Sequence, residues 1–138
     1  MRILTNGLAI FIIILLFSGC QKNIKTTDVL RPNWSEATLK VTGIAKLQND
    51  SAADRLMSLQ RAKSDAYKNL RLELLNIMIT DTKTVGEYVK DKEVIIGQIE
   101  DFVKRGKVTA VRHIPANNSI EVDIELYLGK GFESIILK

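Results

Sequence analysis

Two stretches of the chain alternate between hydrophobic and polar residues, which is the pattern of a β-strand with one buried side. In residues 37–47, one side of the predicted strand is formed by Leu39, Val41, Gly43, Ala45 and Leu47. In residues 119–128, the apolar side is formed by Ile120, Val122, Ile124, Leu126 and Leu128. The glycine inside the first strand predicts a bulge or a close approach of another backbone, such as the helix that follows.

A long helix is predicted between these strands. Ser51 and Asp54 have the spacing of a capping box, with Asp in place of Glu. Mostly apolar residues then recur every three or four positions, as on one face of a helix, with either Ala62 or Lys63 at one position: Leu56, Leu59, Ala62 or Lys63, Ala66, Leu70, Leu74 and Ile77. The small Ala62 and Ala66 would let this helix lie close to a sheet.

The end of this helix is apolar on all sides, which indicates burial on more than one side. The residues concerned are Leu72, Leu74, Leu75, Ile77, Met78 and Ile79. Either a partner subunit or the next segment of the chain could cover them. Residues 80–86 are expected to form a loop.

A second helix is predicted over residues 92–104, with Gly106 placed to cap its end. A β-branched strand over 107–114 and a turn over 115–118 follow, so that 107–128 forms an antiparallel hairpin. A four-residue loop would place Arg112 opposite Glu121, whereas a three-residue loop would place His113 there. A shift of one residue in the register would move every side chain of the strand to the other face of the sheet. The sequence does not decide between these two registers.

The predicted order is β-α-α-β-β. It indicates an α+β fold, in which a three-stranded antiparallel sheet has a long helix packed on one face. Residues 35–138 are long enough for one such domain but not for two. A sheet this small buries little area and leaves two open edges, so the domain would gain from assembly.

The N-terminus has the organisation of a secretory signal. Arg2 precedes ten apolar residues, 8–17, which is the length of a signal-peptide core and too short to span a bilayer. The sequence Leu16-Phe17-Ser18-Gly19-Cys20 resembles the lipobox of bacterial lipoproteins. The resemblance implies a signal peptide at 1–19, cleavage between Gly19 and Cys20, and acyl chains such as palmitate on Cys20. Residues 20–34 would be the lipidated cysteine and a flexible tether, although Trp34 is expected to be the first residue that packs on the domain. Gln21, where inner-membrane lipoproteins have Asp, implies the outer membrane.

Composition narrows the classes of function. The chain has one Cys and one His, which exclude an internal disulfide and almost exclude a Cys/His zinc site. The net charge is +4, and the two signs are interspersed, which is typical of a solvated surface and predicts no nucleic-acid binding.

The most conspicuous polar cluster is Glu121, Asp123 and Glu125 on one side of the last strand. Alternate positions of a strand lie about 6.5–7 Å apart, which is wide for sharing one ion. His113 has no nucleophile near it in the sequence, and no phosphate-binding loop is present. We therefore expect no catalytic residues, no metal, no cofactor and no enzymatic activity.

Three features stand together: the lipobox at Cys20, the strand over 39–45, and a helix containing Arg61-Ala62-Lys63-Ser64-Asp65-Ala66. With the closing hairpin, they resemble the FlgP-like outer-membrane lipoproteins, which include flagellum-associated disk proteins and Helicobacter-type surface antigens. The resemblance implies a structural protein of the cell envelope, anchored through Cys20 and assembling as a homo-oligomer, with flagellar or envelope proteins as partners in motility.

Assembly could use β-augmentation at the open strand edges, with register set by Glu121, Asp123 and Glu125 against Arg112 or Lys107 of a neighbour. The alternative is a surface or periplasmic binding lipoprotein that recognises a peptide, a glycan or a host molecule.

Overall fold

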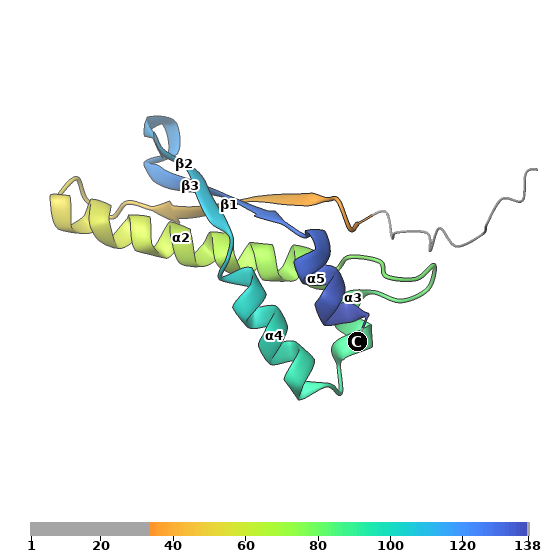
Figure 1. The fold of residues 1–138 in the computed structure, drawn as a ribbon. Helices are drawn as coiled ribbons and strands as arrows, with labels where there is room; N and C mark the ends of the chain where they lie inside the picture. The colour runs from red at the N-terminus through yellow and green to blue at the C-terminus, as the bar shows by residue number, and fades with distance from the viewer. Residues whose placement is uncertain (1–33, 138) are drawn as a thin grey trace, which may run out of the picture. The chain divides into compact units, whose positions relative to one another are not determined.

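A computed structural model describes residues 34–137, and Figure 1 shows their helices and strands. In chain order these are β1 (Thr38–Lys46), α2 (Ala52–Leu75), α3 (Val85–Val89), α4 (Glu93–Val103), β2 (Lys107–Ile114), the short 3-10 turn η2 (Pro115–Asn117), β3 (Ser119–Tyr127) and α5 (Gly129–Ile136). The predicted signal peptide at 1–19 and most of the tether lie outside the described residues.

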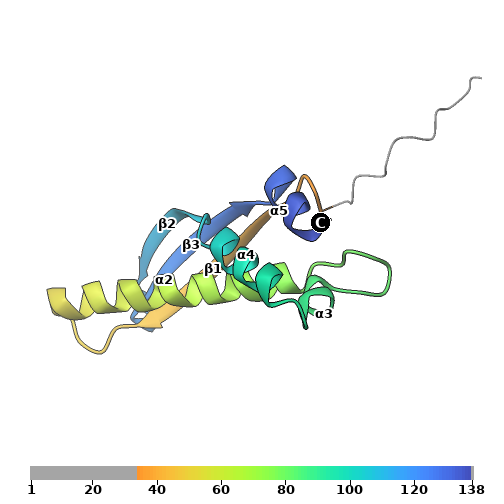
Figure 2. The same ribbon diagram turned by 60° about the horizontal axis from the view of Figure 1, so that its bottom comes forward.

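The three strands form one antiparallel sheet in the order β1-β3-β2, so β3 is central and both β1 and β2 are edges. Helix α2 packs on one face of this sheet, chiefly against β1 and β3. Figures 1 and 2 show α3, α4 and α5 gathered near one end of α2, away from the tip of the β2–β3 hairpin. The predicted α+β fold with a long helix on a three-stranded sheet is confirmed.

The hairpin has the register with the four-residue loop, because Arg112 lies opposite Glu121. Asn118 closes the turn in the left-handed conformation, with φ 48°, which Asn tolerates better than most residues. The apolar side of β3 is buried as predicted, from Ile120 to Leu126. A β-bulge interrupts the pairing between Val108 and Ala110 on β2.

At Gly43, the backbone of β1 lies directly against the backbone of α2, with no side chain between them. A Cβ atom at Gly43 would lie 2.1 Å from the Ala66 backbone nitrogen and 2.2 Å from the Ala62 carbonyl oxygen. Both alanines are fully buried. Of the two readings of Gly43, the close approach of the following helix is therefore correct.

The first turns of α2 differ from the predicted apolar stripe. Leu56 is 60% exposed, and the buried positions are the polar residues Asp54 and Ser58. The Asp54 carboxylate accepts hydrogen bonds from the backbone N–H groups of Gln48 and Asn49, at 2.7 and 2.9 Å. Ser58 donates its hydroxyl to the Lys46 carbonyl, at 3.1 Å. Polar groups face inward here because they satisfy the backbone of the β1–α2 connection.

Two helices were missed in the predicted order. Helix α3 begins inside the expected 80–86 loop, where Thr84 and Glu87 form a capping box. Its Val85 and Val89 are buried, and the Val85 N–H donates to the Ile77 carbonyl at 2.8 Å. Helix α2 ends at Leu75, so Ile77, Met78 and Ile79 lie beyond the helix and do not form its end, contrary to the expectation. The next segment of the chain covers part of this apolar stretch, while Leu72 and Met78 stay exposed.

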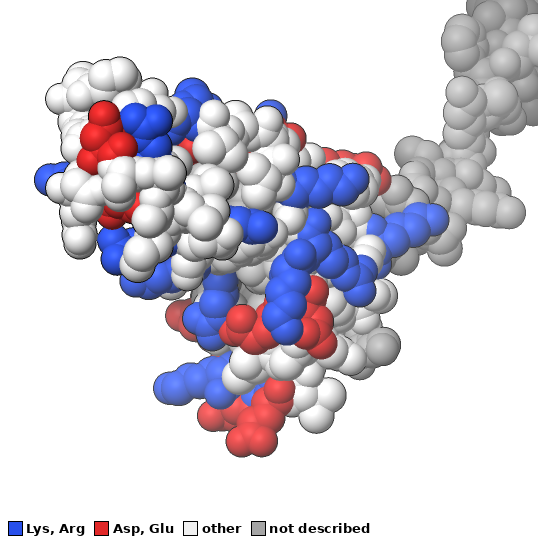
Figure 3. Space-filling model, turned by 90° about the vertical axis from the view of Figure 1, so that its left-hand side faces the viewer, with Lys and Arg blue, Asp and Glu red and all other residues white. Residues whose placement is uncertain are grey.

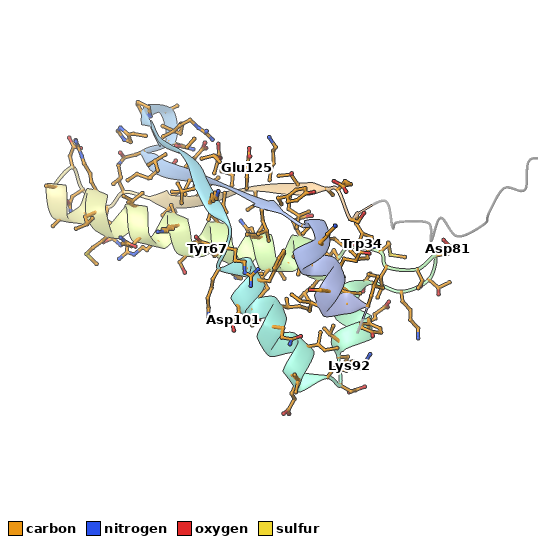
Figure 4. The ribbon with its side chains drawn as sticks, in the orientation of Figure 1. Trp34, Tyr67, Asp81, Lys92, Asp101 and Glu125 are labelled. Atoms are coloured by element: carbon orange, nitrogen blue, oxygen red, sulfur yellow. The ribbon has the colours of Figure 1, made fainter. Side chains whose placement is uncertain are left out.

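Helix α5 is the second omission. Strand β3 ends at Tyr127, and Gly129, with φ 51°, begins a helix that the predicted order β-α-α-β-β does not contain. Its Phe132 is fully buried and meets the ring of Trp34 edge-on, with centroids 5.3 Å apart. Trp34 is therefore packed on the domain, as predicted, and its side chain lies beside α5 in Figure 4. Residues 34–137 belong to a single compact unit.

The contact at Gly43 yields a test of the fold. We predict that Gly43→Ala destabilises the domain by about 3 kcal/mol or more, because the helix must move off the sheet to admit the methyl group. Urea unfolding of residues 21–138 measures this change in the free energy of unfolding. Gly97→Ala is the matched control, since a Cβ at Gly97 in α4 meets nothing within 4 Å. It should stabilise by roughly 0.5–1 kcal/mol through helix propensity. Equal effects of the two substitutions would contradict the close contact.

Candidate functional site

The predicted assembly residues come together on the face of the sheet that points away from α2. Alternation along β3 sends Glu121, Asp123 and Glu125 to this face while the apolar residues of the strand face the helix. Arg112 reaches the same face from β2, as the partner of Glu121. Figure 4 shows Glu125 projecting from this side of the sheet.

Arg112 joins two of the three carboxylates. Its Nη2 lies 2.9 Å from Asp123 Oδ1 and 3.3 Å from Glu121 Oε2, and its Nη1 donates to Asp123 Oδ2. The contact with Asp123 is therefore bidentate, which matches the fork of the guanidinium group. These hydrogen bonds raise the pKa of Arg112 further above its ordinary value.

Strand β1 supplies the remaining partners. The Thr42 hydroxyl donates to Asp123 Oδ1 at 2.8 Å, and Lys40 Nζ lies 2.8 Å from Glu125 Oε1. The hydrogen bonds from Arg112 and then from Thr42 lower the pKa of Asp123 below its ordinary value of 3.8. Glu125 raises the pKa of Lys40 in the same way, by hydrogen bond and by charge. These contacts connect all three strands across one face. We call this set of side chains the polar ladder: Lys40, Thr42, Arg112, Glu121, Asp123 and Glu125.

This arrangement favours a structural role over acid–base chemistry. Each of the three carboxylates already has a cation of the same chain, and the lowered pKa of Asp123 favours its charged form. Within residues 34–137, no group of three or more His, Cys, Asp or Glu side chains is placed to hold a metal ion. Pairing within one chain also accounts for these charges without a neighbouring subunit.

Other candidates lie elsewhere. Gly19 and Cys20, the predicted cleavage and lipidation site, are outside the described residues. His113 is exposed on β2 and pairs with Ile120, so it points to the helix side of the sheet and away from the acidic residues. In the described part of the chain, no helix has the length and hydropathy needed to cross a membrane.

The sequence predicted open sheet edges, but it did not reveal that the edge at β2 is apolar. Val108 lies opposite Ile124 and Val111 lies opposite Val122, so both valines point to the helix side of the sheet. In a regular strand, residues three apart would point to opposite faces, and the bulge between them brings them to one face. Because α2 packs chiefly on β1 and β3, Val108 and Val111 stay 41% and 53% exposed.

Comparison of the chain with protein-family models, with curated proteins and with solved structures gives no match.

The pKa shift of Asp123 predicts a pH dependence of stability. Because its pKa is lowered in the folded state, its stabilising effect is complete above about pH 4 and is lost as the pH falls through the folded pKa. We expect Asp123→Asn to remove this part of the acid-side loss, so that its stability falls less than that of the unmodified domain between pH 4 and pH 2. Thermal unfolding across that range measures the difference.

The matched control is Asp81→Asn, which removes an exposed carboxyl from the loop before α3. Its pH profile should run parallel to that of the unmodified domain. If Asp123→Asn also gave a parallel profile, the ladder would make no pH-dependent contribution to stability.

Proposed function

We propose that this protein is a lipid-anchored structural protein of the bacterial outer membrane that assembles with copies of itself. The lipobox-like sequence ending at Cys20 supports the anchor, and Gln21 supports the outer membrane. The resemblance to FlgP-like lipoproteins supports a place in a flagellum-associated disk or ring needed for motility. The protein is not proposed to be an enzyme.

The observation that carries the assembly is the open edge of β2. Within residues 34–137, β2 pairs only with β3, so the N–H and C=O groups along its other edge have no strand partner. Val108 and Val111 stand exposed beside this edge. A strand added here would satisfy the backbone groups and bury the two valines at the same time, each Å² of apolar surface contributing about 25 cal/mol.

The second edge provides the complementary surface. Strand β1 also has one edge without a strand partner in the described part of the chain, and its helix-side residues are already covered by α2. Placing β2 of one copy along β1 of the next repeats the same heterologous contact. A contact of this kind closes into a ring or continues as a filament, depending on the rotation between copies.

The anchor is tested by Cys20→Ser. We expect the unmodified chain to incorporate labelled palmitate and to fractionate with the outer membrane, because two or three acyl chains make a stable anchor. The variant should lose the label and leave the membrane fraction. Cys20 is the single cysteine of the chain, so no second thiol can replace it. Unchanged labelling and fractionation of the variant would exclude lipidation at Cys20.

The assembly is tested by Val108→Lys/Val111→Lys. Both residues are exposed in the single chain, so the variant should fold, but the added charges should prevent strand pairing at this edge. Light scattering of residues 21–138 over a concentration series should show a discrete ring-sized species or a filament for the unmodified domain and a monomer for the variant.

Leu56→Lys/Met57→Lys is the matched control, since it replaces two exposed apolar residues of α2 far from β2 in sequence. It should assemble like the unmodified domain. A monomer at every concentration for the unmodified domain would contradict self-assembly in solution and would favour a binding lipoprotein instead.

A further inference from the structure

A basic pocket lies where the end of β3 passes into α5. Its volume is about 480 Å³, and its walls come from both edge strands, from the end of α4 and from the first turn of α5. Three cations line it, namely Arg105, Lys107 and Lys130. Glu125 is the one member of the polar ladder that also lines the pocket.

The three cations are not neutralised within the domain. Among residues 34–137, none of them takes part in an ion pair, whereas Glu125 is already paired with Lys40 at 2.8 Å. Arg105 stands over the ring of Phe102, with 5.4 Å between its guanidinium carbon and the ring centroid. The pocket therefore keeps an excess of positive charge. On the side of the domain shown in Figure 3, some Lys and Arg side chains adjoin Asp or Glu and others stand apart from them.

The remaining walls combine apolar and hydroxyl groups. Phe102 and Leu128 line the pocket but are only 3% and 1% exposed, whereas Tyr127 supplies an aromatic ring that is 56% exposed. Thr38 and Thr109 add hydroxyl groups from the two edge strands. A ligand that fits these walls has a compact anionic group for the cations and a neutral body for the aromatic and hydroxyl surface.

The position of the pocket indicates where such a ligand could come from. Trp34, the first described residue, contacts Phe132 at 5.3 Å between centroids, and Phe132 contacts Phe102 at 5.6 Å. Because Phe102 lines the pocket, the pocket lies at the end of the domain that the N-terminal tether joins. If the tether leads to an acylated Cys20, as proposed above, phospholipid headgroups are the nearest phosphate groups.

We propose that the pocket between Arg105, Lys107 and Lys130 binds a phosphate-bearing anion, with the headgroup of an anionic phospholipid as the first source to test. Binding would orient the domain with its tethered end against the bilayer. The argument from position rests on the proposed lipid anchor, whereas the charge and shape of the pocket do not.

The test uses residues 21–138 without acyl chains, because the core is closed by side chains of residues 34–137. One arm measures co-sedimentation with vesicles of phosphatidylglycerol and phosphatidylcholine, compared with vesicles of phosphatidylcholine alone. The other arm measures binding of inorganic phosphate and of glycerol 3-phosphate by NMR titration. Anionic vesicles should bind and neutral vesicles should not, with affinity falling as salt is added.

The pocket variant is Arg105→Gln/Lys107→Gln/Lys130→Gln. With about 1 kcal/mol for each basic residue near an anionic surface, the loss of three should weaken vesicle binding about 100-fold. The matched control, Lys46→Gln/Arg61→Gln/Lys63→Gln, removes the same net charge from exposed positions outside the pocket. It should weaken binding only a few-fold, and unchanged thermal unfolding verifies that both variants fold.

The outcomes are distinct. Equal losses of vesicle-binding affinity in the two variants would mean that the domain is attracted by its net charge alone, and would overturn the proposed pocket site. The absence of binding to both vesicles and soluble phosphates would also overturn it. Binding of the soluble phosphates without binding of vesicles would support the pocket and identify a soluble ligand. None of these results depends on the acylation of Cys20, so the lipid anchor and the pocket can fail separately.

Discussion

The direct contact between the backbone of β1 at Gly43 and the backbone of α2 at Ala62 and Ala66 sets the form of this domain. It leaves no room for a side chain between helix and sheet at this point. Towards the start of α2, the buried positions are therefore polar and bond to the backbone, as Asp54 and Ser58 do. Towards its end, the large Leu70 and Leu74 are buried, and Phe132 and Ile99 of other helices join the core. The core is thus thin at one end of α2 and thick at the other.

This uneven core explains how the sheet is covered. Helix α2 packs chiefly on β1 and β3, and α3, α4 and α5 gather at the thick end. Strand β2 is left with little cover on its helix side, so Val108 and Val111 remain exposed beside an unpaired edge. Soluble proteins usually protect such edges, and one that stays open indicates a surface for another strand. The assembly that we propose follows from this gap.

Charged side chains are paired on one face of the sheet and left without ion pairs at the pocket, among the residues that the structure describes. On the face away from α2, the acidic residues of the central strand are flanked by basic residues of both edges, and the charges are neutralised within one chain. At the end of the sheet near α5, the three cations of the pocket form no ion pair with the described residues. The ladder is therefore best understood as stabilising the sheet, and the pocket as the part that is free to meet an anion.

The sequence by itself determined the elements with a strong local period. Both alternating strands, the long helix and the hairpin were predicted, because alternation and helical spacing report directly which side of an element is buried. For Gly43 the sequence left two alternatives, a bulge or a close backbone approach, and the structure shows the second. Helices α3 and α5 were not predicted because they are short. Their stability comes from burying residues such as Val85 and Phe132 in contacts that form only in the folded chain. Leu56 was misplaced because hydrophobicity alone cannot show that a backbone connection needs Asp54 and Ser58 on the inner side.

Only the tertiary structure decided the surfaces on which the functional proposals rest. The partners of Asp123 depend on the hairpin register, which the spacing of residues left open between two alternatives. The apolar edge depends on a bulge that turns Val108 and Val111 to one face, and the basic pocket joins residues from five separate elements. The proposed lipid anchor is the reverse case, since the expectation rests on a run of neighbouring residues ending at Cys20. Local order can be read along the chain, whereas a surface composed of distant segments exists only once their packing brings them together.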